Sequence, residues 1–127
     1  MGTLNLKRGS KTQRDGARGE RMVLWYLRFR GYHLLDKNYM VGHREIDLIM
    51  RKRNLIIFVE IKSRNNLHHA ILPRWSVNNK KQRNIISASK FYLKRKKLKN
   101  VSYRYDIAEV DLSTRKITYL PNAFCVY

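Results

Sequence analysis

Acidic residues are scarce in this sequence. Nine Asp and Glu residues stand against 28 Lys and Arg residues, which gives a formal net charge of +19 over 127 residues. A positive field of this size favours polyanionic partners, of which nucleic acid is the usual one. An anionic membrane surface or an RNA-rich assembly would satisfy the same field, so the charge alone does not choose the partner.

Cysteine is nearly absent as well, since Cys125 is the only one. A single thiol excludes an intramolecular disulfide framework and a cysteine-rich zinc site, and it agrees with a reducing compartment. No apolar run is long enough to span a membrane, and the N-terminus lacks the apolar region of a signal peptide. The sequence therefore predicts a soluble cytoplasmic protein with no membrane partner.

The length and the 43% hydrophobic content fit one globular domain. Residues 1–16 are polar, basic and without hydrophobic periodicity, so they predict a flexible N-terminal arm. Residues 17–127 then form the single folded domain.

Hydrophobic spacing within that domain predicts two helices and five strands. The helices are expected at about 17–30 and about 79–98, the second opened by a capping pair of Asn79 and Gln82. The strands are expected at 32–41, 45–50, 55–63, 102–111 and 117–120, with a long loop at 64–75. This order, α-β-β-β-α-β-β, predicts an α/β fold with helices flanking a mixed sheet.

The most informative stretch is the hairpin predicted at residues 45–62. Side chains alternate between the two faces of a strand, so Glu45 and Asp47 share one face, and Glu60 and Lys62 share one face of the next strand. If these faces coincide, carboxylates and an amine meet at the centre of an apolar sheet. A surface hairpin with ordinary salt bridges is the alternative, because short motifs have a real false-positive risk.

Both helices direct polar residues towards the same hairpin. The apolar stripe of the first helix, extended back by one turn, ends on Glu20, and that of the second ends on Lys81 and Gln82. If both stripes pack on the sheet, these residues converge on the acidic face of the hairpin. This agreement between separate parts of the chain favours a functional site over a surface hairpin.

Such a site has the parts needed for phosphodiester hydrolysis, namely carboxylates for a hard cation, an amine near the attacking water and a basic surface for the polyanion. Asp47 and Glu60 are the expected direct ligands of Mg²⁺ or Mn²⁺, with the backbone carbonyl of Ile61 as a third. Glu20 could bind directly or through water, and Glu45 either binds the metal or only caps its strand. Lys62 would hold the attacking water.

These residues resemble a known family. Glu45-Ile-Asp47 followed by Val59-Glu60-Ile-Lys62 has the spacing of the PD-(D/E)XK nuclease superfamily, whose core order is αβββαβ. Together with Gly19-Glu20, the chain is most similar to the small bacterial YraN/UPF0102 family of predicted endonucleases, which are distantly similar to archaeal Holliday junction resolvases. The resemblance implies a restriction-endonuclease-like core in which Asp47, Glu60 and Lys62 are catalytic and Glu20 is the helix carboxylate.

The expected partner is DNA, in branched or otherwise structured form, and a homodimer is left open. DNA contacts are expected from polar and basic residues around the acids: Arg18, Arg44, Ser63, Arg64, Lys80, Lys81, Gln82 and Arg83. The main alternative is a non-catalytic nucleic-acid-binding module on the same fold, although such a module would have little reason to keep Asp47, Glu60 and Lys62 together.

Overall fold

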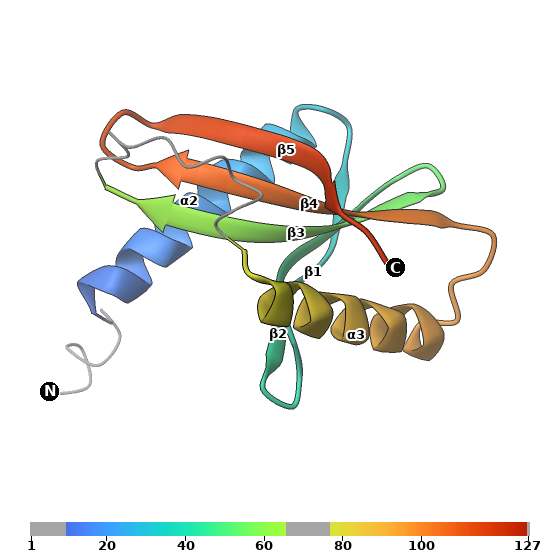
Figure 1. The fold of residues 1–127 in the computed structure, drawn as a ribbon. Helices are drawn as coiled ribbons and strands as arrows, with labels where there is room; N and C mark the ends of the chain where they lie inside the picture. The colour runs from blue at the N-terminus through green and yellow to red at the C-terminus, as the bar shows by residue number, and fades with distance from the viewer. Residues whose placement is uncertain (1–9, 66–76, 127) are drawn as a thin grey trace, which may run out of the picture.

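The computed structural model describes residues 10–65 and 77–126. Seven elements follow one another in the chain: α2 (Lys11–Arg28), β1 (His33–Val41), β2 (Arg44–Lys52), β3 (Leu55–Arg64), α3 (Asn79–Arg95), β4 (Ser102–Asp111) and β5 (Lys116–Phe124). The strands form one sheet in the order β1-β2-β3-β4-β5, in which β3 and β4 run parallel and the other pairs antiparallel. The predicted α/β order and mixed sheet are confirmed, and they contain the αβββαβ core (Figure 1).

The two helices cover opposite faces of the sheet (Figure 1). Val23 and Leu27 of α2 are buried in one cluster with Leu48, Ile57 and Val59. The other cluster contains the buried residues of α3 and the alternate side chains of the same strands: Ile49, Ile56, Phe58, Ile85, Ala88, Tyr92, Tyr105 and Ile107 belong to it. Because β2 and β3 are buried on both faces, any charged side chain in them needs a specific partner.

Helix α2 begins six residues earlier than predicted, so the prediction of an arm through residue 16 is wrong for residues 11–16. The helix starts with a capping box, in which the Ser10 side chain accepts from the Gln13 backbone N–H and the Gln13 side chain accepts from the Ser10 N–H. These bonds satisfy backbone donors of the first turn, which hydrophobic periodicity does not register. Residues 1–9 of the predicted arm lie outside the described residues.

The boundaries of α3 also shift by a few residues. Its N-cap is Asn78, whose side chain accepts from the Lys81 N–H, and Gln82 donates its side-chain N–H to the Val77 carbonyl. The predicted capping pair of Asn79 and Gln82 is therefore wrong: the N-cap is Asn78, the residue three positions on is Lys81, and Gln82 bonds to Val77 instead. The helix ends at Arg95 rather than near Leu98, and β5 extends to Phe124, beyond the predicted 117–120.

None of the helices in residues 10–65 and 77–126 is long and apolar enough to cross a membrane. Most of the predicted loop at 64–75 lies outside the described residues, while its first residue, Arg64, belongs to β3.

Gly19 allows α2 to approach the end of β3. A Cβ atom at this position would lie 1.7 Å from Ser63 Oγ and 2.8 Å from Ser63 Cβ. Since the Cβ of Ser63 is fixed by its backbone, any larger residue at position 19 would push the helix away from the strand. This close approach places Glu20, the next residue, beside the sheet.

We therefore expect Gly19→Ala to lower the melting temperature measured by circular dichroism. Overpacking costs about 1–3 kcal/mol, which outweighs the roughly 1 kcal/mol that Ala gains over Gly in a helix. Ser63→Gly supplies the matched control, because in its background the added methyl group has room. Gly19→Ala should then be neutral or stabilising relative to Ser63→Gly alone. A single Gly19→Ala variant as stable as the wild type would show that α2 does not contact β3 this closely.

Candidate active site

The candidate site forms where β2 and β3 separate. Their ladder of paired residues ends at Leu48 opposite Val59, one position before Asp47 would face Glu60. Beyond this point the Ile61 N–H donates to Asp47 Oδ2 at 2.8 Å, so a carboxylate replaces a backbone carbonyl as the acceptor. The split between the strands lets groups from the helices on both faces reach the same acids.

The half-buried Asp47 and the buried Glu60 form a pair of neighbouring carboxylates. Burial, followed by repulsion from the Glu60 carboxylate, raises the pKa of Asp47 from 3.8 to about 8. The Glu60 side chain is only 2% exposed, and its Oε1 atom has no hydrogen-bond partner among the described residues. A buried carboxylate with an unsatisfied oxygen, beside a second carboxylate, fits the donor chemistry of a cation site.

Lys81 supplies part of the compensating charge from the first turn of α3. Its Nζ lies 2.9 Å from Glu60 Oε2. Burial lowers the pKa of Lys81, but the hydrogen bond and the charge of Glu60, with smaller contributions from Asp47 and Glu45, raise it overall. The prediction that the α3 stripe leads back to the acids is confirmed for this residue.

An open cleft of about 850 Å³ lies over the acids. It is lined by side chains from α2, β1, β2 and β3, which include Glu20, Glu45, Asp47, Lys62, Ser63 and Arg64. Burial, followed by the charge of Asp47, raises the pKa of both Glu20 and Glu45. The four predicted carboxylates therefore share one electrostatic environment.

Their separation is nevertheless too large for a compact cluster. Within residues 10–65 and 77–126, no three Asp, Glu, His or Cys side chains are close enough to hold one metal ion together. Asp47 and Glu60 fit direct binding, and Ile61, whose carbonyl is the expected third ligand, lines the same cleft. Mg²⁺ characteristically keeps several waters in such a site. Glu20 and Glu45 fit as ligands through water.

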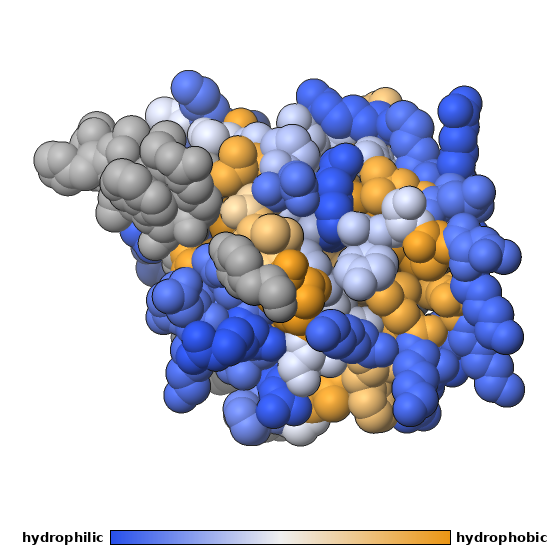
Figure 2. Space-filling view, turned by 45° about the vertical axis from the view of Figure 1, so that its right-hand side comes forward, coloured by the Kyte–Doolittle hydropathy of each residue, from blue (hydrophilic) through white to orange (hydrophobic). Residues whose placement is uncertain are grey.

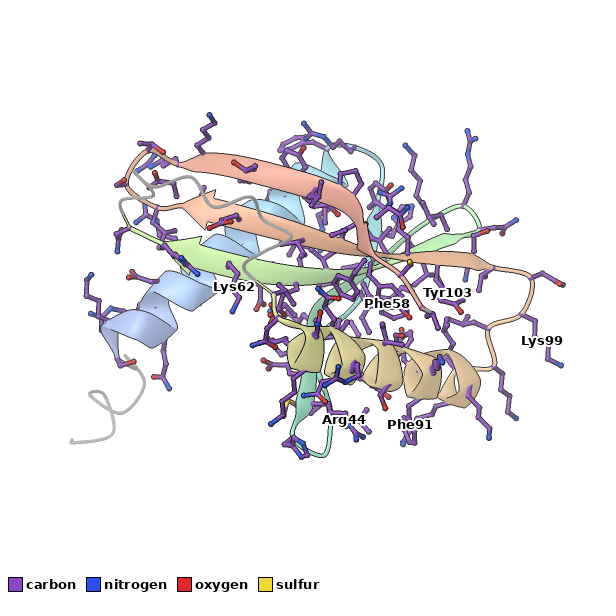
Figure 3. All side chains as sticks on the ribbon, in the orientation of Figure 1. Arg44, Phe58, Lys62, Phe91, Lys99 and Tyr103 are labelled. Atoms are coloured by element: carbon purple, nitrogen blue, oxygen red, sulfur yellow. The ribbon has the colours of Figure 1, made fainter. Side chains whose placement is uncertain are left out.

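Lys62 lines the cleft on the same strand face as Glu60. Figure 3 shows it on β3, between α2 and the beginning of α3. Its neighbour on the parallel strand β4 is Glu109, which is 4% exposed and whose Oε2 has no hydrogen-bond partner within the described ranges. Burial raises the pKa of Glu109, and the charges of Arg64 and Lys62 only partly oppose this.

Comparison with known proteins identifies the family. A model described as "Uncharacterised protein family UPF0102" matches residues 19–110, which run from the second half of α2 through the acids and α3 into β4. The chain belongs to the UPF0102 family. A UPF0102 protein of Clostridioides difficile is 39% identical over 106 residues, which cover 84% of this chain and 92% of that protein. A UPF0102 protein of Dictyoglomus turgidum is 40% identical over 113 residues, covering 86% of this chain and 95% of that one.

The predicted DNA-binding residues of this UPF0102 chain fall into three groups. Ser63 and Arg64 line the cleft over the acids. Arg44 and Lys81 line a second, smaller cleft next to it. Lys80 and Arg83 are exposed residues of α3. Figure 2 shows that hydrophilic side chains border the visible face of the molecule.

Two predicted contacts instead have structural partners. The Arg18 guanidinium lies 3.5 Å from the Leu112 carbonyl oxygen. The Gln82 side chain donates to the Val77 carbonyl oxygen, just before the N-terminus of α3. Their role in DNA binding stays a prediction.

Sequence reasoning missed Lys37 and Asn38 of β1, which line the main cleft of this UPF0102 site. Asn38 Nδ2 donates to Glu20 Oε1 at 3.3 Å, and Lys37 partly offsets the raised pKa of Glu20. A register shift in the preceding part of β1 and a positive φ of 51° at Asn38 accompany this placement. The only sequence signal was a run of three polar residues, Asp36, Lys37 and Asn38, between the apolar ends of the strand.

Proposed function

We propose that this chain is a metal-dependent DNA endonuclease that hydrolyses phosphodiester bonds in branched or otherwise structured DNA. The observation that carries the proposal is the carboxylate pair at the split between β2 and β3, formed by the half-buried Asp47 and the buried Glu60, with Lys62 beside it in an open cleft. A carboxylate pair in this position costs stability unless a cation compensates it, so a purely structural role would be unfavourable.

The residues of the cleft would have different roles in the reaction. Asp47 and Glu60 would hold Mg²⁺ or Mn²⁺, and the Ile61 N–H keeps the Asp47 carboxylate in one orientation. A bound cation would neutralise charge on the phosphate oxygens and increase the acidity of a bound water. Lys62 would orient the attacking water and stabilise the negative charge that develops on the phosphate.

The charge of the chain supports a polyanionic substrate. The chain has a formal net charge of +19, and the lining of the cleft contains basic as well as acidic side chains. Lys and Arg contacts to phosphates give a binding constant that falls steeply with salt. Paired cuts in a four-way junction would require two copies of the chain, so we also propose that a homodimer is the form that acts on such a substrate.

The second candidate is a non-catalytic DNA-binding module on the same fold. It accounts equally well for the positive charge but gives no reason for burying Glu60 with an unsatisfied oxygen. The two candidates differ in what happens to the DNA rather than in whether it binds.

A substrate panel separates them. Purified wild-type protein, Asp47→Ala and Lys62→Ala are incubated with single-stranded, linear duplex and four-way-junction DNA in Mg²⁺, Mn²⁺ or EDTA. We expect the wild type to cut at least one substrate with a divalent cation and not in EDTA, while both variants bind DNA without cutting it. If all three proteins bind and none cuts, the binding-module function replaces the nuclease.

A further inference from the structure

Lys81 occupies an unusual position for a residue expected to bind DNA. Its ammonium is bonded to Glu60, a carboxylate expected to bind the metal, and it also interacts with Asp47 and Glu45. Among the described residues, Lys81 is the cation that forms an ion pair with Glu60. A divalent ion at Glu60 would compete with it for the same carboxylate.

The two partners of this ion pair differ in exposure, so Lys81 is free to move away from Glu60. The Lys81 side chain is 44% exposed, whereas its partner Glu60 is almost fully buried. A lysine ammonium is a compact charge on a flexible stem, so it can change partners without moving the helix. Glu60 cannot follow it, because its strand is buried on both faces of the sheet.

A second cleft offers Lys81 another partner. It has a volume of about 310 Å³, and Lys81 lines it together with Met40, His43, Arg44 and Asn84. Glu45 lines both this cleft and the main one, so the two adjoin across the acids. Figure 3 places Arg44 at the hairpin of β1 and β2, beside α3.

The polar groups of the second cleft suit a phosphate group. Arg44 and Lys81 contribute two positive charges, and the buried Nε of Arg44 lacks a hydrogen-bond partner in the described part of the chain. Guanidinium groups bind phosphate through planar N–H donors, and lysine binds it as a point charge. A nucleotide next to the cleaved one could place its phosphate here and its base against Met40.

We propose that Lys81 changes partners during substrate binding: it holds Glu60 in the metal-free protein and moves to a DNA phosphate in the second cleft when a divalent ion binds Asp47 and Glu60. This inference rests on the proposed nuclease function and adds to it that the substrate strand spans both clefts. Without DNA, the metal must displace Lys81 from Glu60; with DNA, the phosphate receives the displaced ammonium. Metal and DNA therefore bind cooperatively, and by linkage each strengthens the other by the same factor.

The test measures the affinity for Mn²⁺ by calorimetry, with and without a four-way-junction DNA. All proteins carry Lys62→Met, so that the DNA stays intact, and the compared variants add Lys81→Met, Lys81→Gln or Lys80→Met. Lys80→Met is the matched control, because it removes one exposed positive charge from the same helical turn. Lys81→Gln keeps a hydrogen-bond donor for Glu60 in case Lys81→Met does not fold.

With Lys81 present, we expect DNA to tighten Mn²⁺ binding about tenfold, within the roughly 5–150-fold range of typical allosteric couplings. Replacing Lys81 should tighten Mn²⁺ binding in the absence of DNA by a similar factor and reduce the effect of DNA to less than about twofold. Lys80→Met should weaken DNA binding slightly and leave the coupling unchanged.

Coupling that survives in folded Lys81 variants, or Mn²⁺ binding that is unchanged or weakened without DNA, would overturn the inference alone. Coupling of Mn²⁺ to DNA through Lys81 in the Lys62→Met background, together with wild-type protein that cuts no DNA in the substrate panel, would overturn the nuclease function and leave the partner exchange in place. Absence of Mn²⁺ binding in every protein would overturn both.

Discussion

Asp47→Asn is expected to abolish DNA cleavage and, in EDTA, to raise the melting temperature of the protein above that of the wild type. Loss of the metal removes several kcal/mol of transition-state stabilisation, so the cleavage rate should fall by about a thousandfold or more. Asn keeps an oxygen that accepts from the Ile61 N–H and removes the repulsion from Glu60. The Asp47 carboxylate is therefore expected to lower the stability of the metal-free protein while being needed for cleavage.

The expected rise in melting temperature of Asp47→Asn depends on pH. Because the pKa of Asp47 is raised from 3.8 to about 8 in the folded protein, the folded state holds a proton that the unfolded chain releases over this interval. The free energy of unfolding of the metal-free wild type therefore falls as the pH rises from about 4 to about 8. The Asp47→Asn variant lacks this contribution, so its advantage should be largest near pH 8 and vanish near pH 4.

Thermal unfolding in EDTA and in Mg²⁺ measures both effects. Near pH 8 in EDTA the variant should melt at least a few degrees above the wild type, because about 1 kcal/mol corresponds to several degrees in a domain of this size. Adding Mg²⁺ should raise the melting temperature of the wild type and leave that of the variant unchanged. A variant that melts below the wild type in EDTA at pH 8 would show that Asp47 has a structural role.

The second large effect is expected on β4, where two buried carboxylates should respond in opposite directions. Asp106 is 0% exposed and fully bonded: it accepts from the Arg104 guanidinium at 2.9 and 3.2 Å, from the Tyr119 hydroxyl and from the Asn122 N–H at 2.9 Å. Asp106→Asn would replace one accepting oxygen by an amide NH₂ group, which faces the N–H and O–H donors that now bond to Asp106. We expect it to cost about 3–5 kcal/mol, as is typical when one partner of a buried charge pair is removed.

Glu109→Gln is the matched comparison, three residues further along the same strand. Burial raises the pKa of Glu109, which means that its charged form is disfavoured in the folded protein. Gln removes this charge and keeps the shape, so the melting temperature at pH 7 should rise, whereas that of Asp106→Asn should fall by about 10 °C or more. Circular dichroism melts of both variants test this, and a loss of stability in both would mean that the Glu109 charge is well compensated.

Much of the candidate site could be predicted from the sequence because the signals were local. The two-residue period of strands placed Asp47 and Glu60 correctly, and the apolar stripe of α3 led to Lys81. β2 and β3 separate beside Asp47 and Glu60, and the cleft opens at this point. The separation involves a hydrogen bond from the Ile61 backbone N–H to the Asp47 side chain, and hydrophobic periodicity does not predict such a bond.

The rest depended on long-range pairing or on polar caps. Glu109 lies beside Lys62 only because β3 and β4 pair in parallel across the whole of α3, and the sequence offers no register for such a crossover. The early start of α2 depends on the Ser10 capping box, and Arg18 is turned towards Leu112 rather than the cleft by the close packing of that helix. The strand register and the Arg18 contact are decided by tertiary contacts, whereas the capping box is a local side-chain bond that hydrophobic periodicity does not register.

The most direct test of the nuclease function is single-turnover cleavage of an end-labelled four-way junction in Mn²⁺ by wild-type protein and by Lys62→Met, purified side by side. Lys62 has no bond to either acid, so its replacement should leave the fold, the Mn²⁺ affinity and the DNA affinity intact while cleavage falls by about a hundredfold or more. Equal cleavage by both proteins, with DNA binding unchanged, would contradict the assignment of the cleft around Asp47, Glu60 and Lys62 as the active site.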